Sequence, residues 1–398
     1  MIQRIVLVVL NGLGVGPLPD RDVSTGRPPA SGAVDEARGV LAQLVTHVES
    51  LRLPHLETLG LGHITRHPRL LRLDQPDGCF GRVRRESPGL DPLTTYWELG
   101  GLPRAEELPS FRGAVPPDVV RVIEQVAQRP VLQPPTDILE ELLGRHATHA
   151  LREKGLLLWG EVGASCCLAA HESVLPPKDL FRVVREVRTA AKETSLRRLG
   201  ARPYTGTSGA LEWAPGWRDN VMPPPAKTLF DYLSGAVQLI TSFGKCGDFF
   251  NGSGFTRSLP VEDTAAVWMD LLKTLKTTPR GLIVANLFDD LQRAPRERYG
   301  HLLADQLQEF DVHLPELQAL LKPGDMVIVT SDGSRDLDAP EQWEAQYAPL
   351  IVFGPKLARG VNLGDRRSYA DIGQTIADAL AAPELSVGES FLPALRPG

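Results

Sequence analysis

The chain opens with Ile5-Val6-Leu7-Val8-Val9-Leu10, which runs directly into Asn11-Gly12-Leu13-Gly14-Val15-Gly16. A short, continuous apolar run that ends in turn residues is typical of a strand buried on both faces of a parallel sheet. The run is far too short to span a membrane or to form the apolar part of an export signal. We therefore interpret residues 5 to 10 as a buried parallel strand, and nothing here directs export.

Similar short apolar runs recur and alternate with stretches in which apolar residues are spaced three and four apart. The expected strands lie at residues 4–10, 156–159, 237–240, 281–284, 326–329 and 350–353. The expected helices lie at residues 36–48, 117–127, 137–150, 178–194, 262–276 and 300–321. This alternation predicts an α/β protein with a mostly parallel sheet.

Length and composition limit the kind of protein. A chain of 398 residues is too long for one ordinary core, so we expect two domains or one elaborated domain. The net charge of -6 and the lack of a long basic block argue against nucleic acid or an anionic membrane as partner. Cys79, Cys166, Cys167 and Cys246 have no metal-type spacing and make a poor disulfide framework. A reduced, cytoplasmic setting is therefore expected.

Distinctive short segments occur in order along nearly the whole chain. They include Leu53-Pro54-His55-Leu56-Glu57-Thr58-Leu59-Gly60, Trp97-Glu98, Ala169-Ala170-His171-Glu172, Ala201-Arg202-Pro203-Tyr204, Phe243-Gly244-Lys245 and Ala370-Asp371-Ile372-Gly373. Through these segments the chain resembles the phosphopentomutases of the alkaline phosphatase superfamily. The resemblance implies an alkaline-phosphatase-like core, with a mostly parallel sheet flanked by helices, and an inserted smaller α/β cap domain. The expected boundaries are 1–97 and 222–398 for the core and 98–221 for the cap.

The resemblance also implies phosphoryl transfer between the 1 and 5 positions of ribose, through a phosphothreonine and two divalent metals. The family reads Asp-Thr-Met-Thr-Gly-His-Trp-Glu where this chain reads Asp91-Pro92-Leu93-Thr94-Thr95-Tyr96-Trp97-Glu98. The phosphate-accepting threonine falls on Pro92, which has no hydroxyl. Thr94 and Thr95 are candidate substitutes, although a shift of two or three positions points the side chain elsewhere. Alternatively, Pro92 simply begins a helix, where its missing N–H costs nothing.

By the same resemblance, the first metal needs an aspartate at position 11, the threonine that falls on Pro92, and an Asp-His pair at positions 332 and 333. The chain has Asn11, Asp332 and Gly333 there. The ligands of the second metal fall on Leu291, Arg296 and Trp343. A second register through Tyr299-Gly300-His301 places the aspartate on Arg296. Neither site is intact, Asn11 and Asp332 are remnants, and no cofactor is expected.

Two groups near these positions leave alternatives open. Asp289 and Asp290 could form an altered centre for manganese or magnesium, or could be ordinary carboxylates in a turn. Arg296 or Arg335 could replace the metals as a fixed positive charge that binds phosphate, or could lie on a surface loop.

The residues that hold the sugar phosphate in the family are only partly kept. Arg202 matches a phosphate-binding arginine and Lys245 a substrate-facing lysine. At the position of the family's second arginine this chain has Trp217, and Arg218 follows it. The aspartate that would meet a ribose hydroxyl falls on Gly163. Substrate binding by Arg202, Lys245 and Arg218 is therefore one hypothesis, and structural ion pairing of Arg202 and Lys245 is the other.

Three bulky or titratable side chains have a structural and a functional interpretation. His171 lies in an apolar run, where a histidine more often bonds a backbone carbonyl than carries chemistry. Trp217 and Trp343 stand where the family keeps polar functional residues. We expect these two rings to fill the former cleft.

Together the substitutions predict a phosphopentomutase-like protein that has lost mutase activity and that binds a phosphosugar or acts as a scaffold. The alternative is an active phosphomutase or phosphatase with a rearranged metal site that uses Thr94, Asp289, Asp290 and Asp332. The expected partners are a phosphorylated small molecule, a second copy of the chain or an active relative. Nucleic acid and membrane are not expected.

Overall fold

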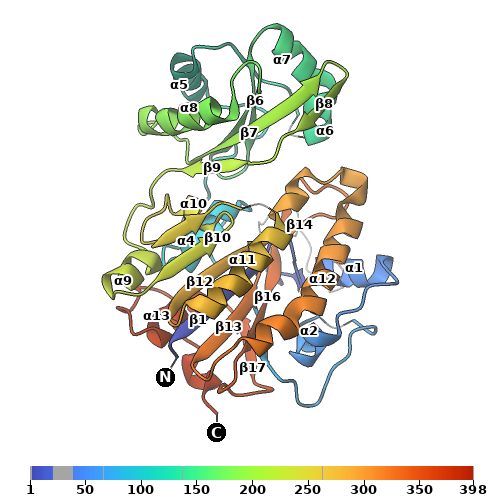
Figure 1. Cartoon of the computed structure of the whole chain (residues 1–398), viewed down its shortest axis with the longest axis vertical. Coiled ribbons are helices and arrows are strands. Elements are labelled where there is room, and N and C mark those ends of the chain that lie inside the picture. Colours follow the sequence, from blue (N-terminus) through green and yellow to red (C-terminus); the bar gives the residue numbers. More distant parts are fainter. Residues whose placement is uncertain (1, 21–38, 66, 137, 262, 398) are drawn as a thin grey trace. The chain divides into compact units, whose positions relative to one another are not determined.

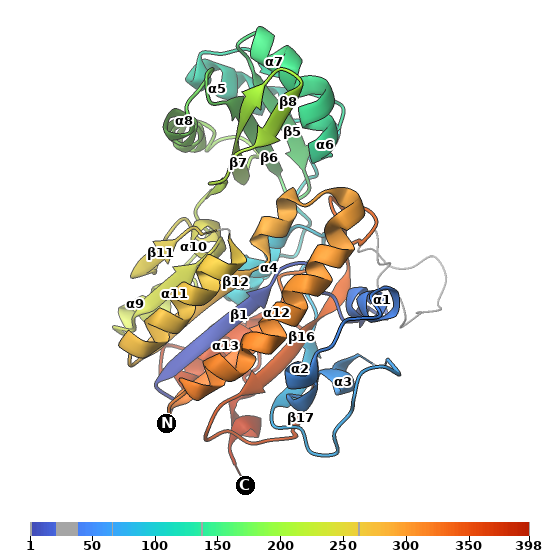
Figure 2. The ribbon, with the colours of Figure 1, turned by 45° about the vertical axis from the view of Figure 1, so that its right-hand side comes forward.

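The computed structural model describes residues 2–20, 39–65, 67–136, 138–261 and 263–397. The chain forms two compact units (Figures 1 and 2). The larger unit comprises Met1–Glu106, Pro225–Gly247 and Ser253–Gly398, and the smaller one Glu107–Pro224 with Asp248–Gly252. The smaller unit is thus inserted in the sequence of the larger one.

A mostly parallel sheet forms the centre of the larger unit. Its strands follow the order β11 (Arg257–Leu259), β10 (Ile240–Phe243), β12 (Gly281–Leu287), β1 (Arg4–Leu10), β13 (Asp325–Thr330), β16 (Gln346–Phe353), β3 (Cys79–Val83) and β17 (Asn362–Arg366). The first five strands are parallel, β16 is antiparallel to both its neighbours, and β17 is parallel to β3. The short β2 (Gly16–Pro17) pairs with β16. The α/β class with a mostly parallel sheet is confirmed.

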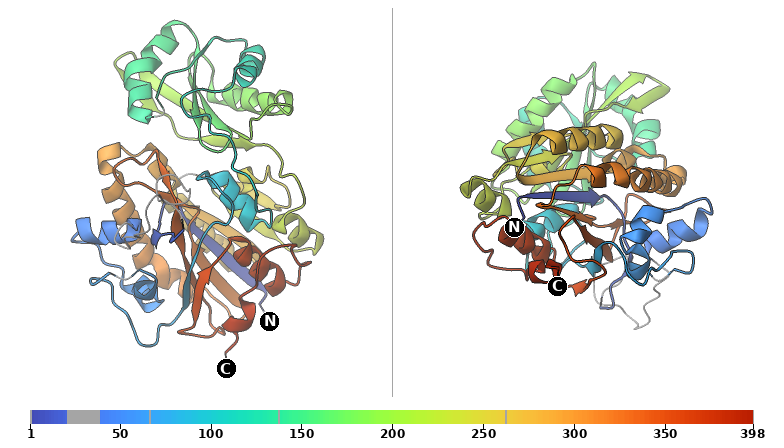
Figure 3. Two further views of the ribbon diagram at one scale, coloured as in Figure 1. Left: turned by 180° about the vertical axis from the view of Figure 1, so that it is seen from behind. Right: turned by 60° about the horizontal axis from the view of Figure 1, so that its bottom comes forward.

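Helices cover both faces of this sheet. The long α11 (Thr264–Thr277) and α12 (Tyr299–Ala319) lie in front of it in Figure 1. The helices α4 (Pro92–Leu99) and α13 (Ala370–Ala379), which contact each other, lie on the opposite face (Figure 3). Every residue of β1 is buried, because both faces of the strand are covered. The smaller elements of this unit include α1 (Val40–His47), α2 (Pro54–Thr58), α3 (Leu61–Ile64), α9 (Leu229–Gly235) and the strand pair β14 (Ser334–Arg335) and β15 (Trp343–Glu344).

The smaller unit has its own sheet and core. Its strands follow the order β4 (Val131–Leu132), β5 (Leu156–Glu161), β6 (Ser165–His171), β7 (Arg198–Thr207) and β8 (Ala210–Trp213), and β9 (Arg218–Val221) pairs with β7. One face carries α5 (Pro117–Ala127) and α8 (Pro177–Ala190) (Figure 2). The other carries α6 (Leu139–Glu141), η2 (Leu142–Ala147) and α7 (Thr148–Arg152). Trp159 and Tyr204 are buried beneath this second group.

Most of the expected elements are present, with shifted ends. The strand expected at residues 237–240 is wrong, because β10 begins only at Ile240 and Val237 is exposed with a φ of +58° in a turn. The starts of the expected helices 36–48, 137–150 and 262–276 lie outside the described residues. Within the described ranges, no helix combines the length and apolar character needed to cross a bilayer.

Candidate functional site

Four neighbouring parallel strands end at one edge of the larger sheet and bring four polar residues together. In the order of the strands β10, β12, β1 and β13, these residues are Lys245, Asp289, Asn11 and Asp332. Each lies one or two positions beyond the end of its strand. The carboxyl ends of parallel strands are where open α/β sheets bind ligands. We call these four residues the strand-end cluster.

Contacts within the strand-end cluster centre on the lysine. Lys245 Nζ lies 2.9 Å from Asp289 Oδ1 and 2.8 Å from Asp332 Oδ2. Asn11 Nδ2 donates a hydrogen bond to Asp289 Oδ1 at 2.6 Å. All four residues are buried, with at most 8% of any of them exposed. In their ionised forms, one ammonium and two carboxylates leave a net charge of -1 in the cluster.

The ammonium of Lys245 is held in its charged form. Burial alone would lower the pKa of Lys245, but the adjacent Asp289 and Asp332 carboxylates outweigh burial and raise the pKa above its ordinary value. Burial raises the pKa of Tyr299 to about 12, and the charge on Asp332 adds to that rise. The same two causes raise the pKa of Tyr96. Asp332 is thus surrounded by groups that stay protonated at neutral pH.

A glycine places Lys245 in the cluster. Gly244 has a φ of +91°, and a Cβ atom there would lie 2.5 Å from Asn286 Cβ on β12. Asn286 Oδ1 accepts a hydrogen bond from the Cys246 amide at 3.0 Å, and its Nδ2 donates to the Tyr96 hydroxyl. The chain therefore turns tightly against β12, and only glycine fits this turn without strain.

Replacing Gly244 with alanine is expected to lower the free energy of unfolding by about 3 kcal/mol, through the left-handed backbone and the overlap with Asn286. Gly364→Ala is the matched control, because Gly364 has a φ of +75° but no atom within 4 Å of the added Cβ. It should cost about 1 kcal/mol. Urea unfolding measures both, and equal losses would show that the close approach to Asn286 does not matter.

A strained residue also precedes Asp289. Phe288 is not a glycine, yet it has a φ of +72°. Its amide donates to Thr264 Oγ1 at 2.8 Å, and Thr264 Oγ1 in turn donates to Asp290 Oδ1 at 2.8 Å. Asp290 also accepts from Gln306 at 2.9 Å. Of the two neighbouring acids, Asp289 therefore belongs to the cluster and Asp290 ties its loop to two helices.

The oxygen atoms of the cluster fit one hard divalent cation. Asn11 Oδ1 is buried and has no hydrogen-bond partner among the described residues. Neither Asp332 oxygen accepts a well-directed hydrogen bond there, although Oδ2 is ion-paired with Lys245. Carboxylate and amide oxygens are the ligands that magnesium and manganese prefer. The residues that would hold the ion are Asn11, Asp289 and Asp332.

The described ranges contain no group of three or more histidine, cysteine, aspartate or glutamate side chains that could hold a metal. At position 333, the six-membered ring of Trp343 lies 3.1 Å from where a Cβ would be. The guanidinium of Arg335 lies over the same ring, 4.1 Å from its centre. A histidine at position 333 would therefore press against Trp343, and the φ of +149° there also disfavours any residue with a Cβ.

The cation of the cluster is not one of the arginines named from the sequence. Arg296 donates to the Asp338 carbonyl at 2.6 Å and pairs with Glu341 at 3.4 Å, and its side chain is 40% exposed. Arg335 donates to the Pro340 carbonyl at 2.5 Å. The fixed positive charge between the two carboxylates is Lys245.

Pro92 occupies the first turn of α4. Asp91 precedes it as the N-cap and accepts from the Thr94 amide and the Thr94 hydroxyl, both at 2.8 Å. Thr95 Oγ1 accepts from Arg85 Nη1 at 3.2 Å. Both threonines are buried. The interpretation that Pro92 begins a helix is confirmed, and both candidate substitute hydroxyls are hydrogen bonded.

Arg202 belongs to a buried ion-pair network of the smaller unit. It is 3% exposed, and its Nη2 donates to Asp219 Oδ1 at 2.9 Å. Its guanidinium lies 4.6 Å from the ring centre of Trp217. Arg198 shares Asp219 at 2.8 Å and pairs with Glu161. These contacts favour the structural interpretation of Arg202.

Arg202→Ala is expected to lower the free energy of unfolding by about 3 kcal/mol, because it leaves Asp219, whose side chain is only 11% exposed, with one partner fewer. Arg182→Ala on the exposed face of α8 is the control and should change stability little, since its pairs with Asp179 and Glu186 are solvated. Urea unfolding followed by tryptophan fluorescence measures both. A stable Arg202→Ala variant would contradict a structural role.

Two other sequence-predicted residues lie in the smaller unit. Arg218 donates to the Trp217 carbonyl at 2.7 Å, and its guanidinium lies 5.7 Å from the Phe181 ring centre. His171 Nε2 lies 3.0 Å from the Gly206 carbonyl oxygen, and Nδ1 lies 2.7 Å from Ser173 Oγ. The expected backbone bond of His171 is confirmed.

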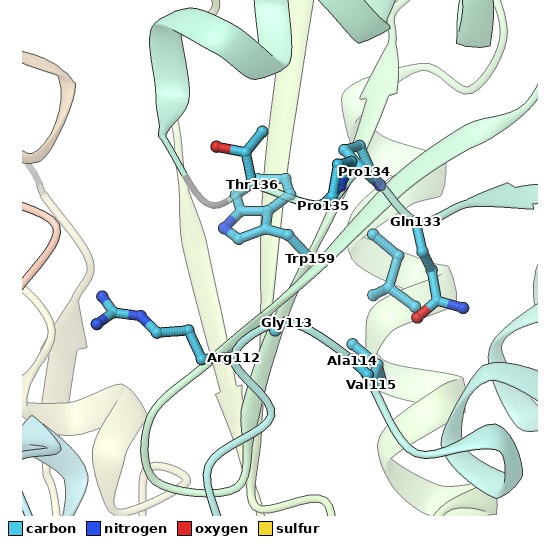
Figure 4. Close-up of a pocket in the computed structure, with 11 residues that line it drawn as sticks. Arg112, Gly113, Ala114, Val115, Gln133, Pro134, Pro135, Thr136 and Trp159 are labelled. Carbon is cyan, nitrogen blue, oxygen red and sulfur yellow. The ribbon is translucent and has the colours of Figure 1, made fainter.

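The smaller unit also contains a hollow of about 120 Å³ beside β5. Figure 4 shows Trp159 and Thr136 side by side on its wall and Arg112 directed away from them. Its lining carries no carboxylate among the described residues. This hollow therefore lacks the metal-binding chemistry of the strand-end cluster.

The chain matches the Metalloenzyme superfamily over residues 3–384 and belongs to it. A protein named phosphopentomutase from Dictyoglomus turgidum is 30% identical over 405 residues, which cover 100% of this chain and 99% of the relative. One from Syntrophotalea carbinolica is 32% identical over 402 residues, 98% of this chain and 97% of the relative. Within the superfamily, the chain belongs to the phosphopentomutase family, as its sequence predicted.

Membership of this superfamily corrects the expectation about cofactors. The sequence suggested that no cofactor would be needed, but the superfamily and the phosphopentomutase relatives point to dependence on a metal ion such as manganese or magnesium. The expectation weighed the substituted ligands one by one. It left Asp289 to the alternative of an altered centre, whereas the structure places Asp289 beside Asn11 at the strand ends, where it supplies a second carboxylate.

Proposed function

We propose that this protein binds a sugar phosphate at its strand-end cluster and does not catalyse the phosphothreonine-dependent mutase reaction. Lys245 between Asp289 and Asp332 supports the binding half of the proposal. Pro92 in the first turn of α4 carries the loss of mutase activity, since proline cannot form the phosphoester that the family resemblance requires there. Stability of the fold does not depend on that chemistry. The buried sheet and its strand-end residues remain in place without it.

With a divalent ion bound, the strand-end cluster would present net positive charge to a phosphate group. Lys245 supplies a compact ammonium with three donors, which suits phosphate as a point charge. A divalent ion held by Asn11, Asp289 and Asp332 would add electrostatic stabilisation of the bound phosphate. The four cysteines are buried and free, which supports the cytoplasmic location that we propose for the protein.

Calorimetric titration with ribose 5-phosphate in saturating manganese tests this function. We expect saturable binding in the wild type that weakens at least about tenfold in Lys245→Met, the loss of one charge-assisted contact. Lys227→Met removes an exposed lysine of the same unit and should bind as the wild type does. A failure of pentose, hexose and nucleotide phosphates to bind would contradict the proposal and favour a scaffold that pairs with an active relative.

A second candidate is an active phosphoryl-transfer enzyme that uses Thr94. It is favoured by the hydrogen bond from Thr94 Oγ1 to Asp91 Oδ2, because a carboxylate beside a hydroxyl can accept its proton during attack. Intact-mass measurement after incubation with a bisphosphorylated sugar separates the candidates. A phosphoryl adduct on Thr94 or Thr95 would support the enzyme, and an unmodified mass is expected.

A further inference from the structure

The negative charges of the strand-end cluster outnumber the positive charge of Lys245, because two carboxylates contact one ammonium. Asp289 and Asp332 are buried carboxylates that both contact the Lys245 ammonium, at 2.9 and 2.8 Å, and Asp289 also accepts a hydrogen bond from Gln292 at 3.2 Å. A buried charge that is not fully neutralised is unfavourable. A divalent ion would neutralise both carboxylates, and the lysine neutralises only one.

Asn11 supplies an independent sign of an unused ligand position. It is 5% exposed, and its amide group contacts Asp289 through Nδ2. Its Oδ1 is buried without a hydrogen-bond partner in the described part of the chain. Buried polar atoms of this kind are rare in folded proteins unless an ion or water satisfies them. The amide oxygen of Asn11 and the carboxylates of Asp289 and Asp332 are the oxygen donors of the cluster.

The Lys245 ammonium and a divalent ion cannot contact the same oxygens of Asp289 and Asp332 together. Magnesium binds oxygen at roughly 2.0–2.1 Å and the larger calcium at about 2.3–2.6 Å. An ion that used the carboxylate oxygens now paired with Lys245 would lie against its ammonium, and two positive charges at contact distance in a buried site repel strongly. The Lys245 ammonium must therefore move away from the carboxylates when the divalent ion binds.

We propose that the strand-end cluster is a single-cation site in which the Lys245 ammonium and a divalent ion of the magnesium or manganese type exchange with each other. The proposal deepens the proposed function, on which it rests for the role of the site. In the ion-free state Lys245 fills the site. When the ion binds, Lys245 is released from Asp289 and Asp332 and its ammonium becomes available to a phosphate.

Manganese binding without any sugar phosphate tests the exchange. Titration of metal-free protein with Mn²⁺, followed by electron paramagnetic resonance of the free ion, should give a dissociation constant at least tenfold lower in Lys245→Met than in the wild type. Lys227→Met should equal the wild type, and Asp332→Asn should bind at least tenfold more weakly. Unchanged or weaker binding in Lys245→Met would overturn the proposal.

A second measurement uses only the wild type, so it holds if Lys245→Met does not fold. Amine-directed labelling with peptide mass spectrometry should modify Lys245 slowly without metal, because its side chain is 9% exposed. Saturating Mn²⁺ should raise that rate several-fold and leave Lys227 unchanged. Bound Mn²⁺ with no change at Lys245 would overturn the exchange. Neither test contains phosphate, so a protein that exchanges cations but binds no sugar phosphate would contradict the proposed function alone.

Discussion

Lys245→Met is expected to lower the free energy of unfolding by about 3–5 kcal/mol in metal-free buffer at neutral pH. Methionine matches the lysine stem in length but leaves Asp289 and Asp332 facing each other without a cation in a buried site. The loss is the free energy of burying unpaired charge, which exceeds that of an exposed ion pair. Urea unfolding in the presence of a chelator measures it.

Two controls separate charge from packing in this experiment. Lys227→Met should change stability by less than about 0.5 kcal/mol, as most surface substitutions do. The double variant Lys245→Met, Asp332→Asn should recover a large part of the loss, because it carries one buried negative charge fewer. Manganese should also restore stability to Lys245→Met. A variant as stable as the wild type without metal would contradict the role given to Lys245.

The contribution of Lys245 should not depend on pH in the neutral range. Its folded pKa lies above the ordinary lysine value of 10.5. The stability it contributes is therefore fully present below that value and is lost only as the pH rises through the higher folded pKa. A fall in stability between pH 6 and 9 has to come from other groups.

Pro92→Thr is expected not to restore mutase turnover. The substitution returns a hydroxyl to the first turn of α4, but the second-metal positions remain Leu291, Arg296 and Trp343. When nucleophile and metals act as a unit, losing one member costs nearly as much as losing all. Turnover should stay at least about 10⁴-fold below that of an active relative assayed in parallel, such as the Dictyoglomus turgidum protein.

The same variant has a stability control. Replacing a proline that fits its backbone should lower the free energy of unfolding by about 0.4–1 kcal/mol, through the more flexible unfolded chain. A folded Pro92→Thr protein without turnover supports the view that the metal centre and the nucleophile were both altered. Turnover within tenfold of the relative would mean that the missing hydroxyl was the only defect.

The fold was readable from the sequence because its signals are local. The apolar run at residues 5–10, ended by Asn11 and Gly12, has one good structural solution in an α/β chain, and β1 is that solution. Pro92 after Asp91 is likewise a local signal for the start of a helix. The strand expected at 237–240 failed because a short apolar run cannot show which of its residues turn the chain.

The centre of the site was not readable in the same way. Lys245, Asp289 and Asp332 meet only because β10, β12, β1 and β13 are neighbours, although they lie far apart along the chain. The sequence therefore directed attention to Arg296 and Arg335 as the replacement charge. Polar residues shortly after expected strands, such as Asn11 after residue 10 and Asp332 after residue 329, were a signal that could have pointed to the cluster.

For Arg202, the sequence named the residue but could not show its partners in the fold. Its match to a phosphate-binding arginine is a property of the alignment, whereas its partner Asp219 is brought to it by the pairing of β7 with β9. Arg198, on the same strand β7, shares that carboxylate. The sequence left both interpretations of Arg202 open. Burial to 3% exposure favours the structural one.

Conversion of ribose 1-phosphate to ribose 5-phosphate, followed by phosphorus NMR with manganese and a bisphosphorylated sugar present, tests the central claim most directly. The wild-type protein should give no conversion above the protein-free sample, because Pro92 cannot carry the phosphoryl group. Rapid conversion by a preparation free of host enzyme, comparable to that of an active relative, would contradict the account.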